Sequence, residues 1–127
     1  MAYPDLVGMV VHDMAASLRF YRLLGLDIPP EADEDTHVEV TAAGGFRIAW
    51  DTLDLMRQID PAWPEPSGHR MGLAFKCDSP AEVDALYIKV TEAGYKSHRP
   101  PWDAFWGQRY AQVLDPDGAV VDLFADQ

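Results

Sequence analysis

The hydrophobic and polar positions of the first half of the chain predict a strand, a helix and a hairpin. Apolar residues dominate Leu6–His12, which predicts a strand, and apolar positions three and four residues apart over Met14–Leu24 predict a helix. Hydrophobic and polar residues alternate over His37–Thr41 and Phe46–Asp51, with Ala43–Gly45 between them. Two such segments around a glycine-containing loop are typical of a hairpin.

The second half repeats this order. Residues Arg70–Cys77 alternate as a strand, and Ser79 has the hydroxyl expected of a helix N-cap. The following helix is predicted to end at Gly94, since glycine readily adopts the left-handed conformation of a helix stop. Two further strands are predicted over Gln108–Leu114 and Ala119–Ala125.

The two halves therefore align as repeats, with glycines at matching places. We predict a fold of the α+β class, with two tandem βαβββ units over about 1–60 and 68–127 in a single domain of residues 1–127. A connector with three prolines joins them. The units are expected to form a curved mixed sheet, with helices on the outer face and a concave ligand cavity opposite.

Composition limits the partners. Ten Lys and Arg against 21 Asp and Glu give a net charge of −11, which disfavours binding to nucleic acid. The charge would attract a cationic ligand, or it serves only to keep the protein soluble. No apolar stretch approaches the roughly 20 residues of a membrane span, and the first residues lack a signal-peptide pattern. With a single cysteine, Cys77, predicted to be buried in the core, the expected location is cytoplasmic.

Three segments resemble the vicinal-oxygen-chelate superfamily, which contains glyoxalases, extradiol dioxygenases and bleomycin-resistance proteins. They are Val11–Gly25, Trp106–Tyr110 and Asp115–Leu123, in the order that this superfamily has. The resemblance implies the paired-unit fold, and for the resistance-type members a homodimer. It also implies that the tryptophan of the Trp-Gly motif, here Trp106, lies at the ligand site.

The resemblance further implies four metal-ligand positions, which correspond to Leu6, Ala49, Gly72 and Asp122. Leucine, alanine and glycine side chains cannot coordinate a cation, and one carboxylate is too few for a divalent ion. We therefore expect no metal and no other cofactor, and neither glyoxalase nor dioxygenase activity. The histidines are spread over different elements without ligand spacing, and surface or hydrogen-bonding roles are expected for them: His12, His37, His69 and His98.

Candidate ligand-binding residues follow from strand alternation and from the aromatic loops. The polar residues predicted on the concave face are His37, Glu39, Arg47, Asp51, Tyr110, Gln112 and Asp122. The aromatic residues predicted in loops are Trp63, Trp102, Phe105 and Trp106. Indole and phenyl rings stack on flat conjugated ligands and attract cations. The alternative is that these rings cap the core or form a dimer contact.

These features favour a drug-binding resistance protein. It would sequester an aromatic antibiotic, cationic or neutral, of the bleomycin, mitomycin or enediyne type without altering it. The alternative is a metal-independent isomerase or cyclase acting on an aromatic metabolite, with Asp122 as acid or base and Glu39, His37 or Tyr110 assisting. Whether the protein is an enzyme stays open at this point, although binding is favoured. A third possibility is that the concave face meets only another protein.

Overall fold

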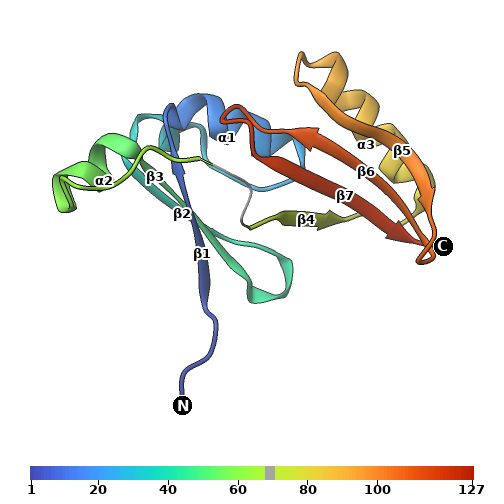
Figure 1. Ribbon diagram of the computed structural model, residues 1–127, viewed down its shortest axis with the longest axis horizontal. Helices are drawn as coiled ribbons and strands as arrows, with labels where there is room; N and C mark the ends of the chain where they lie inside the picture. The colour runs from blue at the N-terminus through green and yellow to red at the C-terminus, as the bar shows by residue number, and fades with distance from the viewer. Residues whose placement is uncertain (68–70) are drawn as a thin grey trace. The chain divides into compact units, whose positions relative to one another are not determined.

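The computed structural model describes residues 1–67 and 71–127, and the chain folds into two compact units, Met1–Ser67 and Gly68–Gln127. Both units combine strands with helices, so the predicted α+β class is confirmed (Figure 1). Each unit has a mixed sheet of its own. In the described part of the chain, no helix has the length and apolar character needed to cross a membrane.

Unit 1 has a three-stranded sheet with strand order β1-β3-β2. Strands β1 and β3 are parallel, whereas β2 and β3 are antiparallel. Its main elements are β1 (Leu6–Val11), α1 (Met14–Leu23), β2 (His37–Thr41), β3 (Arg47–Thr52) and α2 (Leu53–Ile59), with short 3-10 turns at Pro30–Glu34 and Ala43–Gly45.

Helix α1 begins and ends where the sequence predicts. The Asp13 side chain accepts a hydrogen bond from the free amide of Ala16 at 3.1 Å. Gly25 follows the helix with a φ of 102°, a backbone conformation that favours glycine. Tyr21 of α1 contacts Trp50 of β3, with ring centroids 5.6 Å apart, and both side chains are fully buried. This contact fixes the helix-covered face of the unit 1 sheet.

Unit 2 has a four-stranded sheet with strand order β4-β7-β6-β5. Strands β4 and β7 are parallel, and the other neighbours are antiparallel. Helix α3 packs against β6 and β7, where Val83 and Val90 of the helix are buried together with Val113 and Leu123. The elements are β4 (Leu73–Lys76), α3 (Pro80–Glu92), β5 (Ser97–Ala104), β6 (Gln108–Leu114) and β7 (Val120–Asp126).

The structure differs from the predicted repeat pattern in unit 1, where two strands rather than three follow the helix. The Arg22 guanidinium holds the segment after α1, donating to the carbonyls of Ile28 and Pro29 and to the Asp33 carboxylate. That segment therefore packs along α1, and its Pro30–Glu34 part forms a 3-10 turn instead of a strand.

In unit 2 the predicted aromatic loop is in part a strand. Strand β5 runs through Pro100 and Pro101 to Ala104, so Trp102 lies in a sheet and only Phe105 and Trp106 lie in the turn that follows. Proline lacks the amide donor that a central strand needs, which is why the sequence argued against a strand here. Because β5 is the edge strand, and its register shifts between Arg99 and Trp102, the prolines are accommodated (Figure 1).

Candidate functional site

Polar side chains gather on the face of the unit 1 sheet opposite to Trp50. The strand register pairs His37 with Asp51 and Glu39 with Ala49, and successive residues of a strand point to opposite faces. His37, Glu39, Arg47 and Asp51 therefore share one face, as strand alternation predicts.

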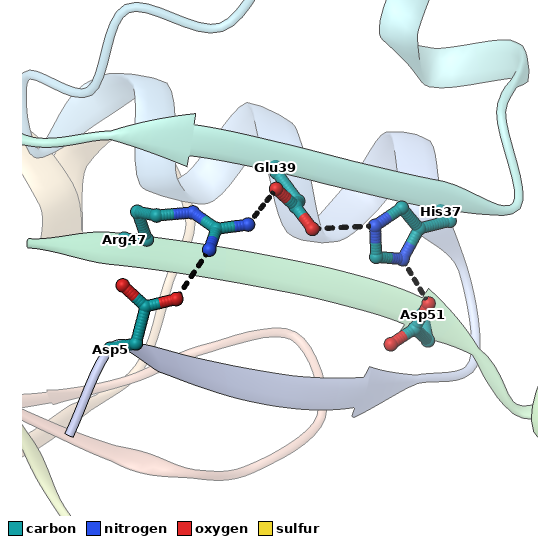
Figure 2. A network of polar contacts seen from close by, with 5 residues as sticks. All are labelled: Asp5, His37, Glu39, Arg47 and Asp51. Atoms are coloured by element: carbon teal, nitrogen blue, oxygen red, sulfur yellow. Dashed lines mark hydrogen bonds and ion pairs between the residues drawn. The ribbon is translucent and has the colours of Figure 1, made fainter. Parts of the chain in front are cut away.

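These side chains form a continuous network with Asp5 (Figure 2). The Arg47 guanidinium donates to Asp5 at 2.6 Å and to Glu39 at 2.5 Å. The second Glu39 oxygen lies 3.1 Å from Nε2 of His37, and Nδ1 of His37 lies 2.5 Å from Asp51. Asp5 precedes the first strand, and sequence reasoning missed it because no alternation pattern reaches that position.

The network favours a doubly protonated His37. Each ring nitrogen faces a carboxylate oxygen, and only the imidazolium form can donate to both. The hydrogen bond to Asp51 is the main cause that raises the pKa of His37 above its usual 6.5. In the same way, the Arg47 guanidinium, followed by His37, lowers the pKa of Glu39. The charged side chains on this face are therefore paired with one another.

On the unit 2 sheet, Asp122 is held by two neighbours on the next strand. The Tyr110 hydroxyl donates to one Asp122 oxygen at 2.6 Å, and the Gln112 side-chain amide donates to the other at 3.0 Å. All three side chains are partly buried. Burial, followed by the hydrogen bond to Asp122, raises the pKa of Tyr110 to about 12, so this phenol stays protonated and acts as a donor at neutral pH.

Beside Asp122 lies a group of contacting rings that we call the aromatic surface. Tyr110 is at its centre, with ring centroids 5.3 Å from Trp102, 5.4 Å from Trp106 and 5.9 Å from Phe124. Phe105 contacts Trp106 at 5.0 Å. The side chain of Phe105 is 97% exposed and that of Trp106 is 49% exposed. The aromatic surface is thus defined as Trp102, Phe105, Trp106, Tyr110 and Phe124.

The aromatic surface is held in place by polar contacts. The Trp106 indole N–H donates to the side-chain oxygen Oε1 of Gln108 at 2.8 Å, and the Gln108 side-chain amide donates to Asp126 at 2.9 Å. The Arg99 guanidinium lies over the Trp102 ring, 3.6 Å from its centroid. Sequence reasoning missed Gln108 and Arg99 as site residues. Alternation places Phe124, two residues after Asp122 on the same strand, on the same concave face, although Phe124 was not among the candidate site residues.

The predicted site residues therefore fall into two groups, one in each unit. One is the unit 1 network, and the other comprises Trp102, Phe105, Trp106, Tyr110, Gln112 and Asp122 in unit 2. Trp63 belongs to neither group within its unit. It lies in the turn after α2, where its backbone amide donates to Asp60 and its carbonyl accepts from Arg57.

A separate hollow of about 260 Å³ lies in unit 2, between the end of α3 and the turn from β6 to β7. None of the predicted site residues lines it, so it lends no support to their assignment. Its lining residues are Gly94, Tyr95, Lys96, Leu114, Asp115, Pro116 and Gly118.

Cys77, His12 and His98 lie outside both groups. Cys77 is buried, as predicted, and burial raises the pKa of its thiol. Nε2 of His12 lies 2.5 Å from Glu65, and His98 is exposed on β5. His69 lies outside the described residues.

The positions that the superfamily uses for metal do not fit a metal here. Within residues 1–67 and 71–127, no three His, Cys, Asp or Glu side chains are grouped to hold a metal ion. Asp122 pairs with Ala74 on the parallel neighbouring strand, and the corresponding pair in unit 1 is Gly8 with Ala49, so these parallel-strand partners supply no ligand. The two Asp122 oxygens already accept hydrogen bonds from Tyr110 and Gln112.

Fold and sequence define the class of protein. The family described as the Glyoxalase/Bleomycin resistance protein/Dioxygenase superfamily matches residues 4–123, and the chain belongs to this superfamily. No curated protein is significantly similar in sequence.

Solved structures with this fold are similar over nearly the whole chain. A hypothetical protein from S. aureus has a TM-score of 0.81 and 22% identity, over 98% of this chain and 95% of its own. A family enzyme from Burkholderia phytofirmans has a TM-score of 0.79 and 21% identity, over 97% and 98%. A glyoxalase/bleomycin resistance protein/dioxygenase from Nocardioides has a TM-score of 0.71 and 27% identity, over 99% and 85%. Because one fold hosts many activities, function must be argued from the site.

Proposed function

We propose that the protein binds a flat aromatic natural product on the aromatic surface and sequesters it without chemical change. The ligand class is that of aromatic antibiotics such as bleomycin-, mitomycin- or enediyne-type compounds. The observation that carries this proposal is the juxtaposition of exposed, ordered rings with a fixed carboxylate, Asp122.

Exposed rings on a folded protein favour binding when they are held in one orientation. Trp106 is half exposed, yet its indole N–H is tied to Gln108 and its ring contacts Tyr110 and Phe105. A ring that is already ordered loses little conformational freedom when a ligand stacks on it. Aromatic stacking contributes about 0.5–1.5 kcal/mol per pair beyond the area that it buries.

Asp122 supplies a polar contact at a defined place. A carboxylate has about four acceptor positions, and Tyr110 and Gln112 occupy two of them. The remaining positions can accept an N–H or O–H of a ligand that stacks on the neighbouring rings. The metal positions Leu6, Ala49 and Gly72 carry no donor atoms, which supports binding through rings and hydrogen bonds.

A metal-independent isomerase or cyclase is the second candidate, favoured by the short contact between Tyr110 and Asp122. In that reading Asp122 accepts a proton from a bound aromatic metabolite. Tyr110, with its pKa raised to about 12, stays a hydrogen-bond donor throughout. Homodimer formation is a further part of the proposal. In such a dimer, the exposed rings of both copies would lie at the dimer interface.

The test is a titration of the metal-free protein with a panel of DNA-damaging aromatic antibiotics, in which tryptophan fluorescence reports binding. The ligand is then recovered and analysed by mass spectrometry. Quenching at micromolar concentration with the drug recovered unchanged supports sequestration. Conversion of the drug that is lost in Asp122→Asn establishes the enzyme instead, and no response from any compound contradicts both proposals.

A further inference from the structure

Arg99 lies at the edge of the aromatic surface in an arrangement that the proposed binding of a neutral ring does not explain. Its guanidinium lies on the Trp102 ring, with Cζ 3.6 Å from the centroid. The strand register pairs Arg99 with Gln112 and Trp102 with Tyr110, so these residues share one face of the unit 2 sheet. Arg99 is thus a cation in contact with Trp102, on the face of the sheet that also carries Asp122.

Four other arginines of this acidic protein are paired with carboxylates. Arg22 pairs with Asp33, and Arg57 with Glu65. Arg47 and Arg109 are each held between two acidic side chains, namely Asp5 and Glu39 for the first and Asp84 and Asp103 for the second. Among the described residues, no carboxylate lies within ion-pair distance of the exposed Arg99. Its charge is therefore available to a ligand.

Stacking on Trp102 also orients the guanidinium. With Cζ 3.6 Å from the ring centroid, the guanidinium contacts the indole face, and this contact reduces the number of orientations that its N–H donors can take. Between the two residues, Pro100 and Pro101 fix their φ angles and limit the backbone freedom of this part of β5. An anionic group at the ring edge would meet a charged donor that is already oriented.

We propose that Arg99 binds an anionic group of the ligand, so that the ligand is a planar aromatic compound carrying a carboxylate or a phosphate. This inference rests on the proposed function of the aromatic surface. The net charge of −11 favours cations at long range, but salt screens that attraction over about 10 Å. At contact distance the unpaired Arg99 decides the preference, because Asp122 already receives two internal hydrogen bonds.

The experiment compares three probes of one ring system by isothermal titration calorimetry: 2-naphthoate, 2-naphthamide and 2-naphthylmethylammonium. The wild-type protein is expected to bind 2-naphthoate about fivefold more tightly than 2-naphthamide, the gain of a partly exposed charge pair. Arg99→Gln should abolish this preference, so that 2-naphthoate and 2-naphthamide bind with the same affinity. The control Arg19→Gln removes the same charge from an exposed position on α1 in the other unit and should keep the preference.

Equal affinity of wild type for 2-naphthoate and 2-naphthamide would overturn the role of Arg99, and the aromatic surface would still stand as a binding site. The same holds if Arg99→Gln keeps the preference, or if 2-naphthylmethylammonium binds more tightly than 2-naphthoate. Absence of binding by all three probes would overturn both this inference and the proposed function. The two failures are therefore distinguishable.

Discussion

The substitution Tyr110→Phe tests whether the hydrogen bond to Asp122 stabilises unit 2. The change keeps the ring and its contacts with Trp102, Trp106 and Phe124. It removes only the hydroxyl, which donates to Asp122 at 2.6 Å. Any loss of stability is then assigned to one donor.

A matched control in the same unit is Tyr87→Phe. The Tyr87 hydroxyl donates to the Ser97 hydroxyl, also at 2.6 Å, but this contact is neutral and more exposed. Hydrogen bonds to charged groups contribute about 1.5–3 kcal/mol, and neutral ones about 0.5–1.5 kcal/mol. Because Asp122 is only partly buried, we expect Tyr110→Phe to lower the free energy of unfolding by about 1.5 kcal/mol. We expect about 0.5 kcal/mol for Tyr87→Phe.

The assay is urea unfolding at neutral pH, monitored by circular dichroism. The midpoint and slope of the transition are compared among the wild type and the two variants. Equal losses for the two variants would refute the reasoning that the carboxylate makes the Tyr110 bond the stronger one. A stabilised Tyr110→Phe variant would refute it as well, since it would mean that Asp122 gains nothing from the phenol.

The remaining predictions concern binding, pH and thiol chemistry. Trp106→Ala should weaken binding of an aromatic antibiotic by about 1–3 kcal/mol without unfolding the protein, whereas Trp63→Ala should not, as calorimetry would show. Equal effects would remove Trp106 from the site. The raised pKa of His37 means that its network stabilises the fold fully below about pH 6.5 and that this contribution is lost as the pH rises through the raised value. Urea unfolding at several pH values should therefore show that the free energy of unfolding declines less in His37→Gln than in the wild type as the pH rises through this value. Identical pH profiles of the two proteins would count against a stabilising role of the His37 network. Buried Cys77 should react with Ellman's reagent only after unfolding, and rapid reaction of the native protein would contradict its burial.

Local signals made much of the fold predictable from the sequence. Asp13 caps α1, and Ser79 accepts from the Glu82 amide at the start of α3, as side chains of this kind do. Gly25 and Gly94 both have the positive φ that ends a helix. Alternation placed His37 and its partners on one face because a strand has a strict period of two.

Tertiary context determined what the sequence did not reveal. Two successive prolines argue against a strand, and only the edge position of β5 makes them compatible with one. Arg99 reaches Trp102 across a shift in register, and no spacing rule describes such a shift. Asp5, which precedes β1, joins its network through a contact with Arg47, a residue distant in the sequence. The sequence identified most of the ring-bearing residues but not the polar residues that orient them.

The central claim is that the aromatic surface of unit 2 is the ligand site, and the indole N–H signals of the four tryptophans test it directly. A two-dimensional ¹H–¹⁵N NMR titration with the aromatic antibiotics resolves each indole. The account predicts that Trp102 and Trp106 shift with a common saturation curve, whereas the buried Trp50 and the connector residue Trp63 do not. Shifts confined to Trp50 or Trp63, or no shift with any compound, would contradict it.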